Sequence, residues 1–116
     1  MDIPQLTPYN ILLVGGSCAD EYLFGHAERL SAEAPVPVFD VEHRESRGGM
    51  AANVLNNLVS LGNKVDFVTN RHTIKKTRVI DLKSNQQLLR IDEGKAIDCF
   101  EIESVFASPA KYDALV

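Results

Sequence analysis

Ser46-Arg47-Gly48-Gly49-Met50-Ala51-Ala52-Asn53 is the stretch on which the fold of this 116-residue chain depends. Its two adjacent glycines predict a tight turn whose bare main chain leaves room for a ligand. A helix should begin directly after the turn, because apolar residues recur at three- and four-residue spacing until Gly62 provides a left-handed stop. The stretch therefore predicts a binding turn mounted on a buried helix. The alternative is a simple hairpin end before an ordinary amphipathic helix.

Composition and charge limit the classes of protein to consider. With 45% hydrophobic and 24% charged residues, the chain is ordinary for one soluble domain. A net charge of -4 with scattered Lys and Arg residues argues against a DNA or RNA partner. The chain has two cysteines, Cys18 and Cys99, and its first residues lack the basic region of an export signal. We therefore expect a cytoplasmic protein with free thiols. The longest apolar run, residues 11–14, is far shorter than the roughly 20 residues of a membrane helix.

A short apolar run and a carboxylate after it suggest a ligand site at a sheet edge. Residues 11–14 predict a strand buried on both faces, and residues 64–69 predict a second, parallel strand after the helix. Asp20 follows the carboxyl end of the first strand, where open α/β sheets bind ligands. A carboxylate there can accept hydrogen bonds from neighbouring sugar hydroxyls, or Asp20 can be a simple turn residue. Gly15-Gly16-Ser17 does not continue as a dinucleotide fingerprint.

The other segments predict a small sheet that projects from the main one. Residues 35–44 contain prolines and β-branched residues, which favours an edge strand. Residues 77–82 and 86–92 predict a hairpin around the loop 83–85, with polar residues on one face that could serve a site or face solvent. A helix is expected over residues 96–108 and a final buried strand from residue 112. The predicted fold class is α/β, in one domain over residues 1–116.

Four blocks of the sequence, taken together and in this order, carry a resemblance to a known family. They are LVGGSCADEYLFG (13–25), RLSAEAPVPV (29–38), GGMAANV (48–54) and NQQLLRID (85–92). These blocks resemble the amino-terminal part of ribokinase-like (PfkB) carbohydrate kinases, most closely the branch that phosphorylates D-glycero-D-manno-heptose 7-phosphate. The resemblance implies part of a ribokinase-like α/β sheet with a projecting β-sheet, the lid, which covers the sugar and often forms a clasp between two subunits. It also implies a phosphorylated sugar as substrate, with ATP and Mg²⁺ required by the complete enzyme.

The resemblance also assigns roles to individual residues. Asp20 matches the aspartate that binds sugar hydroxyls, and Gly48 and Gly49 match the glycine turn beside the sugar. Asn53 matches the asparagine of the first helical turn that reaches the same sugar. Gln87 and Arg90 fall in the lid hairpin near the sugar phosphate. The implied site is therefore Asp20, Gly48, Gly49, Asn53, Gln87 and Arg90.

Departures from the family pattern bear on catalysis. Gly15-Gly16 stands where the branch usually has Gly-Asp, so one acidic residue near the site is missing. No Gly-Ala-Gly-Asp sequence occurs, so the family's catalytic aspartate has no counterpart, and no catalytic or metal-binding residue is assigned. Phosphoryl transfer depends on the positioning of such groups, and this chain alone should be inactive and should hold neither ATP nor Mg²⁺. Asn70 and Arg71 also abut where the family has several tens of residues.

Two hypotheses follow from these matches and departures. In the first, the chain is the substrate-binding and lid part of a sugar kinase. In the second, it is a non-catalytic sugar-binding or dimerisation module derived from such a kinase.

The lid strands also predict association. We expect a homodimer through the lid sheet, because the sheet carries apolar positions that would lie uncovered, namely Val38, Val79, Ile80, Leu88 and Leu89. The alternative is a monomer whose lid folds back on its own helix at Leu55 and Leu58.

Overall fold

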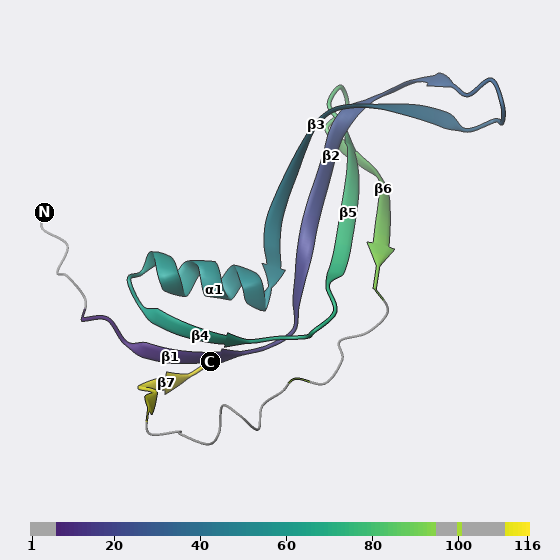
Figure 1. Ribbon diagram of the computed structural model, residues 1–116. Helices are drawn as coiled ribbons and strands as arrows, with labels where there is room; N and C mark the ends of the chain where they lie inside the picture. Colours follow the sequence, from purple (N-terminus) through teal and green to yellow (C-terminus); the bar gives the residue numbers. More distant parts are fainter. Residues whose placement is uncertain (1–6, 95–99, 101–110) are drawn as a thin grey trace, which may run out of the picture.

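The described part of the chain forms two β-sheets that meet at an angle, with one helix packed beside their junction (Figure 1). The computed structural model describes residues 7–94, 100 and 111–116. The elements in chain order are β1 (Asn10–Val14), β2 (Ser17–Leu30), β3 (Pro37–Met50), α1 (Ala51–Ser60), β4 (Lys64–Val68), β5 (Ile74–Asp81), β6 (Gln86–Glu93) and β7 (Ala114–Leu115). We call β4-β1-β7 the core sheet and β3-β2-β5-β6 the lid sheet.

The core sheet is parallel, as the sequence predicted for its first two strands. β1 pairs with β4 along its whole length and with β7 on its other side. Ile11, Leu12 and Leu13 are 6%, 4% and 3% exposed, which fits the continuous apolar run of a central strand. The expected α/β class is confirmed.

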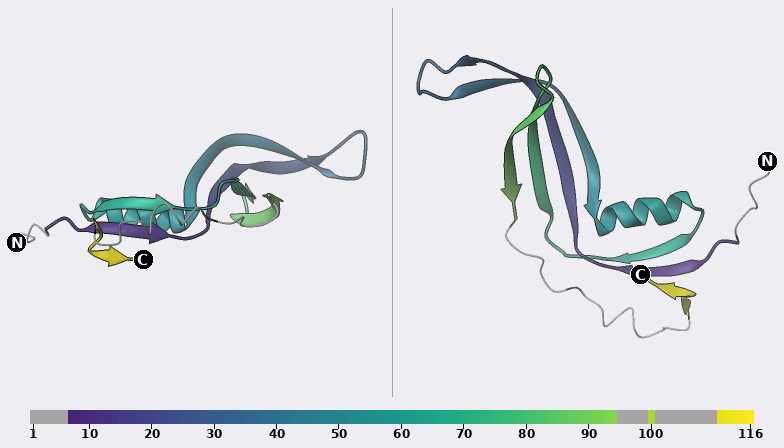
Figure 2. Two further views of the ribbon diagram at one scale, coloured as in Figure 1. Left: turned by 60° about the horizontal axis from the view of Figure 1, so that its bottom comes forward. Right: turned by 180° about the vertical axis from the view of Figure 1, so that it is seen from behind.

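Helix α1 begins and ends where the sequence predicted, but it is not the buried helix that was expected. No residue of α1 is buried, and its apolar face reaches only half-burial at Leu55 and Leu58. Val59 and Leu61 are 54% and 63% exposed. The physical reason is that α1 lies along one side of β1 and β4, and no second layer of the described chain covers its outer side (Figures 1 and 2).

The lid sheet contains a long strand that the sequence did not predict. β2 pairs antiparallel with β3 and parallel with β5, and β5 continues antiparallel into β6. Of the two alternatives for Asp20, the simple turn residue was wrong, because Ser17 to Asp20 begin the strand β2. The whole of β2 contains several residues of low strand propensity, namely Ala, Gly, Asp and Glu, and the strand is stabilised by a partner strand on each side. The hairpin between β5 and β6 is confirmed.

Three connections between the two sheets meet at one place, which is held by a small polar group. The side chain of Asn70, which is 8% exposed, accepts a hydrogen bond from the Ser17 backbone N–H at 2.8 Å and donates one to the His72 carbonyl at 2.6 Å. The hydroxyls of Ser17 and Thr69 lie 2.6 Å apart, and Ala51 N–H donates to the Gly16 carbonyl at 3.0 Å. We call Ser17, Thr69 and Asn70 the hinge cluster. The hinge cluster ties the β1–β2 connection to the β4–β5 connection, and the Ala51–Gly16 bond adds the β3–α1 connection.

The last described segment crosses the core sheet. The Tyr112 hydroxyl donates to the Asp66 carboxylate of β4 at 2.6 Å, and Lys111 Nζ donates to the same oxygen at 3.1 Å. These two bonds hold the pKa of the Asp66 carboxyl below its ordinary value. β7 confirms a strand after residue 112, but Leu115 is 63% exposed, so the expectation of a buried strand was wrong. The helix expected over residues 96–108, together with Cys99, lies outside the described residues.

The molecule is extended and thin. Its radius of gyration is 19.7 Å and its extents are 63 × 44 × 15 Å, whereas a compact chain of this length would have a radius of gyration of about 13 Å. The lid sheet is a single layer over most of its length (Figure 2). Within the described ranges, no helix is long and apolar enough to cross a membrane. Much apolar surface therefore stays exposed.

Candidate functional site

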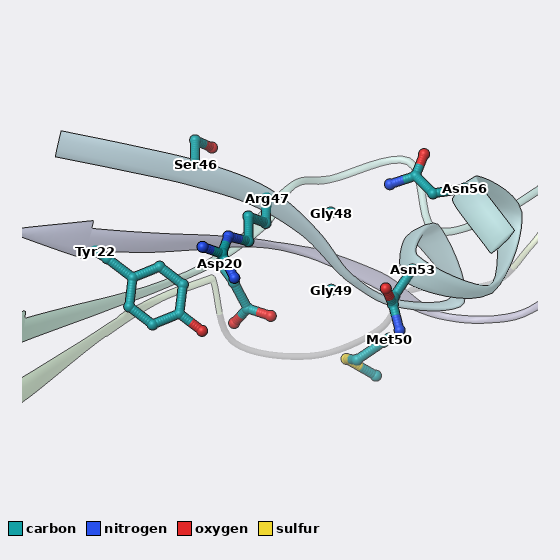
Figure 3. A pocket seen from close by; sticks show the side chains of 9 residues that line it. All are labelled: Asp20, Tyr22, Ser46, Arg47, Gly48, Gly49, Met50, Asn53 and Asn56. Atoms are coloured by element: carbon teal, nitrogen blue, oxygen red, sulfur yellow. The ribbon is translucent and has the colours of Figure 1, made fainter. Parts of the chain in front are cut away.

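A pocket of about 510 Å³ lies where β3 leaves the lid sheet and enters α1 (Figure 3). It is lined by Asp20, Tyr22, Ser46, Arg47, Gly48, Gly49, Met50, Asn53 and Asn56. The structure thus brings together Asp20, Gly48, Gly49 and Asn53, although Asp20 comes from β2 and Asn53 from α1. Carboxylate, amide and backbone groups that converge on an open hollow provide several hydrogen-bonding positions for a polar ligand.

The two glycines do not form the turn that the sequence predicted. Gly48 and Gly49 lie in the extended end of β3, and the chain turns into α1 at the last residue of that strand, Met50, whose φ of 55° and ψ of -129° are unusual for a residue with a side chain. Glycine is required here for space. A Cβ at Gly49 would overlap the Asp20 carboxylate and lie 2.6 Å from Cys18 Sγ, and a Cβ at Gly48 would lie 2.9 Å from Ala52 Cβ. The bare main chain lets β3 pass directly beside Asp20.

Asp20 is held in place by an arginine from a distant part of the chain. Arg78 Nη1 donates to Asp20 Oδ1 at 2.7 Å, and the two side chains are 23% and 21% exposed. The bond to Asp20 holds the pKa of the Arg78 guanidinium above its usual value. Because Arg78 occupies one oxygen, Asp20 Oδ2 is the oxygen beside Gly49 that can accept a hydrogen bond from a ligand.

Tyr22 forms one wall of the pocket between two cations. The guanidinium carbons of Arg47 and Arg78 lie 5.6 Å and 5.4 Å from the centre of its ring. Contacts of this kind orient an aromatic ring without closing its exposed edge. Sequence reasoning missed Tyr22, Arg47 and Arg78. A signal existed for Arg78, which lies on a strongly alternating strand, but its meeting with Asp20 depends on the parallel pairing of β2 with β5.

Gln87 and Arg90 are not brought to this pocket. Both lie on β6, and β5 separates that strand from β2. Arg90 donates instead to the neighbouring Asp92 at 2.8 Å and is 50% exposed, while Gln87 pairs with Ile80 toward the hairpin end. Among the residues that the structure describes, no group of three or more His, Cys, Asp or Glu side chains could hold a metal ion.

The chain has relatives among known proteins. The chain is 39% identical over 112 residues to the bifunctional protein HldE of Geobacter metallireducens, and 41% identical over 110 residues to the HldE of Helicobacter pylori strain Shi470. The chain is a homologue of the HldE proteins. Each match covers 72% of this chain but only 22% and 24% of the respective relative, so the chain spans about a quarter or less of their length. No family model matches.

A solved structure supports the fold. A candidate sugar kinase from Clostridium perfringens matches with a TM-score of 0.53 at 13% identity, over 94% of this chain and 43% of its own. At that identity the likeness concerns the fold alone, which is that of ribokinase-like carbohydrate kinases. The HldE relatives and this likeness of fold together confirm the family resemblance that was inferred from the sequence blocks.

The alignment also contains a gap within this chain. The match to the Geobacter metallireducens protein extends over 112 residues, yet it covers 72% of 116 residues, which is about 84. About a quarter of the aligned positions therefore have no counterpart here. In the structure, β4 continues into β5 through residues 69–73 alone.

Proposed function

We propose that this chain binds a phosphorylated sugar, such as a heptose 7-phosphate, in the pocket beside Asp20. The observation that carries the proposal is the convergence of Asp20, Gly48, Gly49 and Asn53 on one hollow from three separate elements. Homology to the HldE proteins and the ribokinase-like fold support a sugar as the ligand. The choice of heptose 7-phosphate rests on the resemblance of the sequence blocks.

Each pocket residue would make a different contact with the sugar. Asp20 Oδ2 would accept hydrogen bonds from two neighbouring hydroxyls, while Arg78 fixes the carboxylate through Oδ1. The Asn53 amide, exposed on the first turn of α1, can both donate and accept. The bare backbone of Gly48 and Gly49 would let the sugar ring lie close to β3.

In this proposal the chain is the substrate-binding and lid part of a sugar kinase. The complete family enzyme would use ATP and Mg²⁺, but the residues described here do not fit a metal-nucleotide site, since no carboxylate cluster is present among them. We further propose that the alignment gap lies between Asn70 and Arg71, where β4 and β5 are joined so shortly. The cytoplasm is the proposed compartment.

A second function, a dimerisation module, is supported by the uncovered lid sheet. Leu88, Leu89 and Ile91 of β6 are 47%, 56% and 43% exposed, and apolar groups exposed together favour association. Of the positions expected to form a lid interface, Val38 and Ile80 are half-buried, but Val79 is only 7% exposed and lies too deep to contribute. We propose a homodimer through the lid sheet, centred on β6.

Calorimetry with D-glycero-D-manno-heptose 7-phosphate tests the sugar-binding proposal. Asp20→Asn replaces a charged acceptor with a neutral one and should weaken binding by more than about 1 kcal/mol, or roughly fivefold in Kd. Asp40→Asn, at the far end of the lid where Asp40 pairs with Arg29, is the matched control and should bind like the wild type. Equal affinity of the Asp20→Asn and wild-type proteins would contradict the assigned role of Asp20.

A further inference from the structure

The pocket side of the lid sheet carries a row of charges that the strand register defines. Asp20 on β2 pairs with Arg47 on β3 and with Lys76 on β5, and Lys76 in turn pairs with Asp92 on β6. Alternate residues of a strand face the same side, so the next row on this face lies two residues further along. That row consists of Glu45, Tyr22, Arg78 and Arg90.

Three of the four cations on this face are already neutralised. Arg78 pairs with Asp20 at 2.7 Å, Arg90 with Asp92 at 2.8 Å, and Arg47 with Glu45 at 2.9 Å. These pairs use all three carboxylates of the two rows. The face therefore keeps one positive charge, although the chain as a whole has a net charge of -4.

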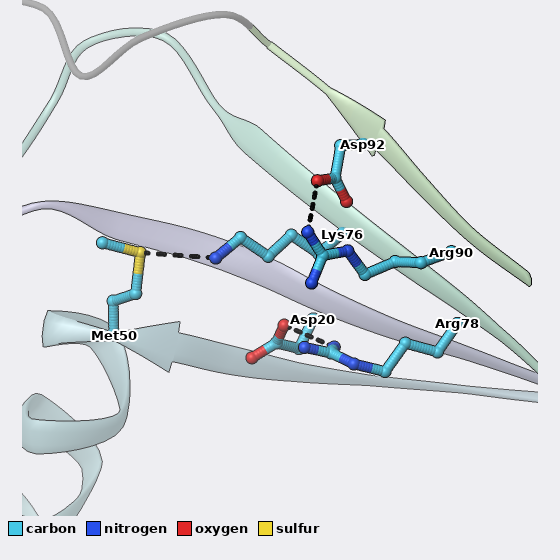
Figure 4. A network of polar contacts seen from close by, with 6 residues as sticks. All are labelled: Asp20, Met50, Lys76, Arg78, Arg90 and Asp92. Carbon is cyan, nitrogen blue, oxygen red and sulfur yellow. Dashed lines mark hydrogen bonds and ion pairs between the residues drawn. The ribbon is translucent and has the colours of Figure 1, made fainter. Parts of the chain in front are cut away.

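The remaining charge belongs to Lys76. Its ammonium group contacts the sulfur of Met50 at 4.0 Å, and among the residues that the structure describes it has no carboxylate within ion-pair distance. Asp92 lies directly opposite Lys76 in register, but its carboxylate is bound by Arg90 (Figure 4). Lys76 thus reaches across β2 toward the pocket, past Asp20, and no carboxylate of the described residues pairs with it.

The position of this ammonium group indicates what it can bind. Met50 lines the pocket, so the Lys76 nitrogen lies at the pocket's rim, and Asp20 beside it is held by Arg78. An ammonium is a compact charge with three donors, which suits a phosphate oxygen. An anion at this rim would complete the charge pairing of the face.

We propose that Lys76 selects a sugar that carries an anionic group, specifically a phosphate, over the same sugar without it. This inference rests on the proposed sugar-binding function. It moves the phosphate contact away from Arg90, whose guanidinium is engaged by Asp92 on a strand further from the pocket. Lys76 is a specificity-determining residue in this proposal, while Asp20 and Asn53 bind the hydroxyls that both sugars share.

The experiment compares two ligands on four proteins. Calorimetry measures the affinity of D-glycero-D-manno-heptose 7-phosphate and of the same heptose without phosphate for the wild type, Lys76→Met, Lys76→Arg and Lys75→Met. Lys75 is the matched control, because it precedes Lys76 on β5, faces the other side of the sheet and pairs with Glu21 and Glu93. Far-UV circular dichroism confirms that each variant is folded.

We expect Lys76→Met to weaken binding of the phosphorylated heptose about 10- to 100-fold, the range for a lost charge-assisted hydrogen bond, and to leave the neutral heptose unchanged. Lys76→Arg should restore most of the affinity, and Lys75→Met should bind both ligands like the wild type. Added salt should weaken the phosphorylated ligand alone, because the exposed ion pair is screened.

Two results would overturn the inference and are distinguishable from each other. In the first, the wild type binds both heptoses, and Lys76→Met lowers the affinity of neither or of both equally. Lys76 then does not recognise the phosphate, while the sugar-binding proposal stands. If the wild type binds neither heptose, the sugar-binding proposal itself fails and the role of Lys76 fails with it.

Discussion

Replacing Asn70, a buried polar residue outside the pocket, should lower the free energy of unfolding of the protein. Its side chain is 8% exposed and is the centre of the hinge cluster. Asn70→Ala removes the acceptor of the Ser17 backbone N–H and the donor to the His72 carbonyl, at 2.8 Å and 2.6 Å. It also removes the partner of the Thr69 hydroxyl at 3.0 Å. The β1–β2 and β4–β5 connections between the core sheet and the lid sheet would then lose the side chain that joins them.

The expected loss can be worked from these bonds. Each of the two backbone hydrogen bonds contributes about 1 kcal/mol net, and a buried donor left without an acceptor costs a further 1–3 kcal/mol or so. We therefore expect the free energy of unfolding to fall by about 3–5 kcal/mol. Asn70→Asp keeps the acceptor for Ser17 but places a carboxylate oxygen against the His72 carbonyl, so it should destabilise by a similar amount.

Urea denaturation followed by circular dichroism measures both variants. Asn57→Ala is the control, since Asn57 is exposed on α1 and alanine is the better helix former, so its stability should stay within about 0.5 kcal/mol of the wild type or rise slightly. If Asn70→Ala and Asn70→Asp both unfold within about 0.5 kcal/mol of the wild type, Asn70 does not hold the two sheets together, and the reasoning from its bonds is wrong.

Two further predictions follow from the pocket wall and the lid. Gly49→Ala should cost about 1–3 kcal/mol of stability and displace Asp20 from Arg78, because the added Cβ would overlap the Asp20 carboxylate. Gly62→Ala is the comparison: Gly62 has a φ of +87° but open space around it, so this substitution should cost only about 1 kcal/mol. Urea denaturation compares them, and equal losses would refute the crowding argument. Sedimentation at micromolar protein tests the proposed lid dimer, which Leu88→Asp should dissociate without unfolding the protein. If the wild type sediments as a monomer and Leu88→Asp changes neither its mass nor its fold, the lid dimer is refuted.

Several features of the fold could be predicted from short stretches of sequence. A continuous apolar run marked β1, a helical period between Met50 and Gly62 marked α1, and the loop at residues 83–85 marked the hairpin of β5 and β6. The motif blocks also selected Asp20, Gly48, Gly49 and Asn53, which the pocket brings together. These features depend on residues close in the chain, where periodicity and turn chemistry act directly.

Other features depended on which strands become neighbours. β2 has no clear strand pattern of its own, and its pairing with β5 joins Asp20 to Arg78 across 58 positions of sequence. The same pairing sets Lys76 beside Asp20 and leaves Arg90 with Asp92 on a more distant strand. Gly48 and Gly49 do not form the predicted turn, because they lie in an extended strand that packs closely against Asp20 and Ala52.

The sequence by itself determined the local elements, the family and the pocket residues that lie in its motifs. Only the tertiary structure decided the order of the lid strands, the partner of each charge and the exposure of α1. The physical reason is that propensity and periodicity are properties of one segment, whereas register and charge pairing are free energies shared between segments far apart in the chain. The charge of Lys76, which has no carboxylate partner among the described residues, belongs to this second class, because it becomes visible only when each carboxylate beside it has been assigned to another cation.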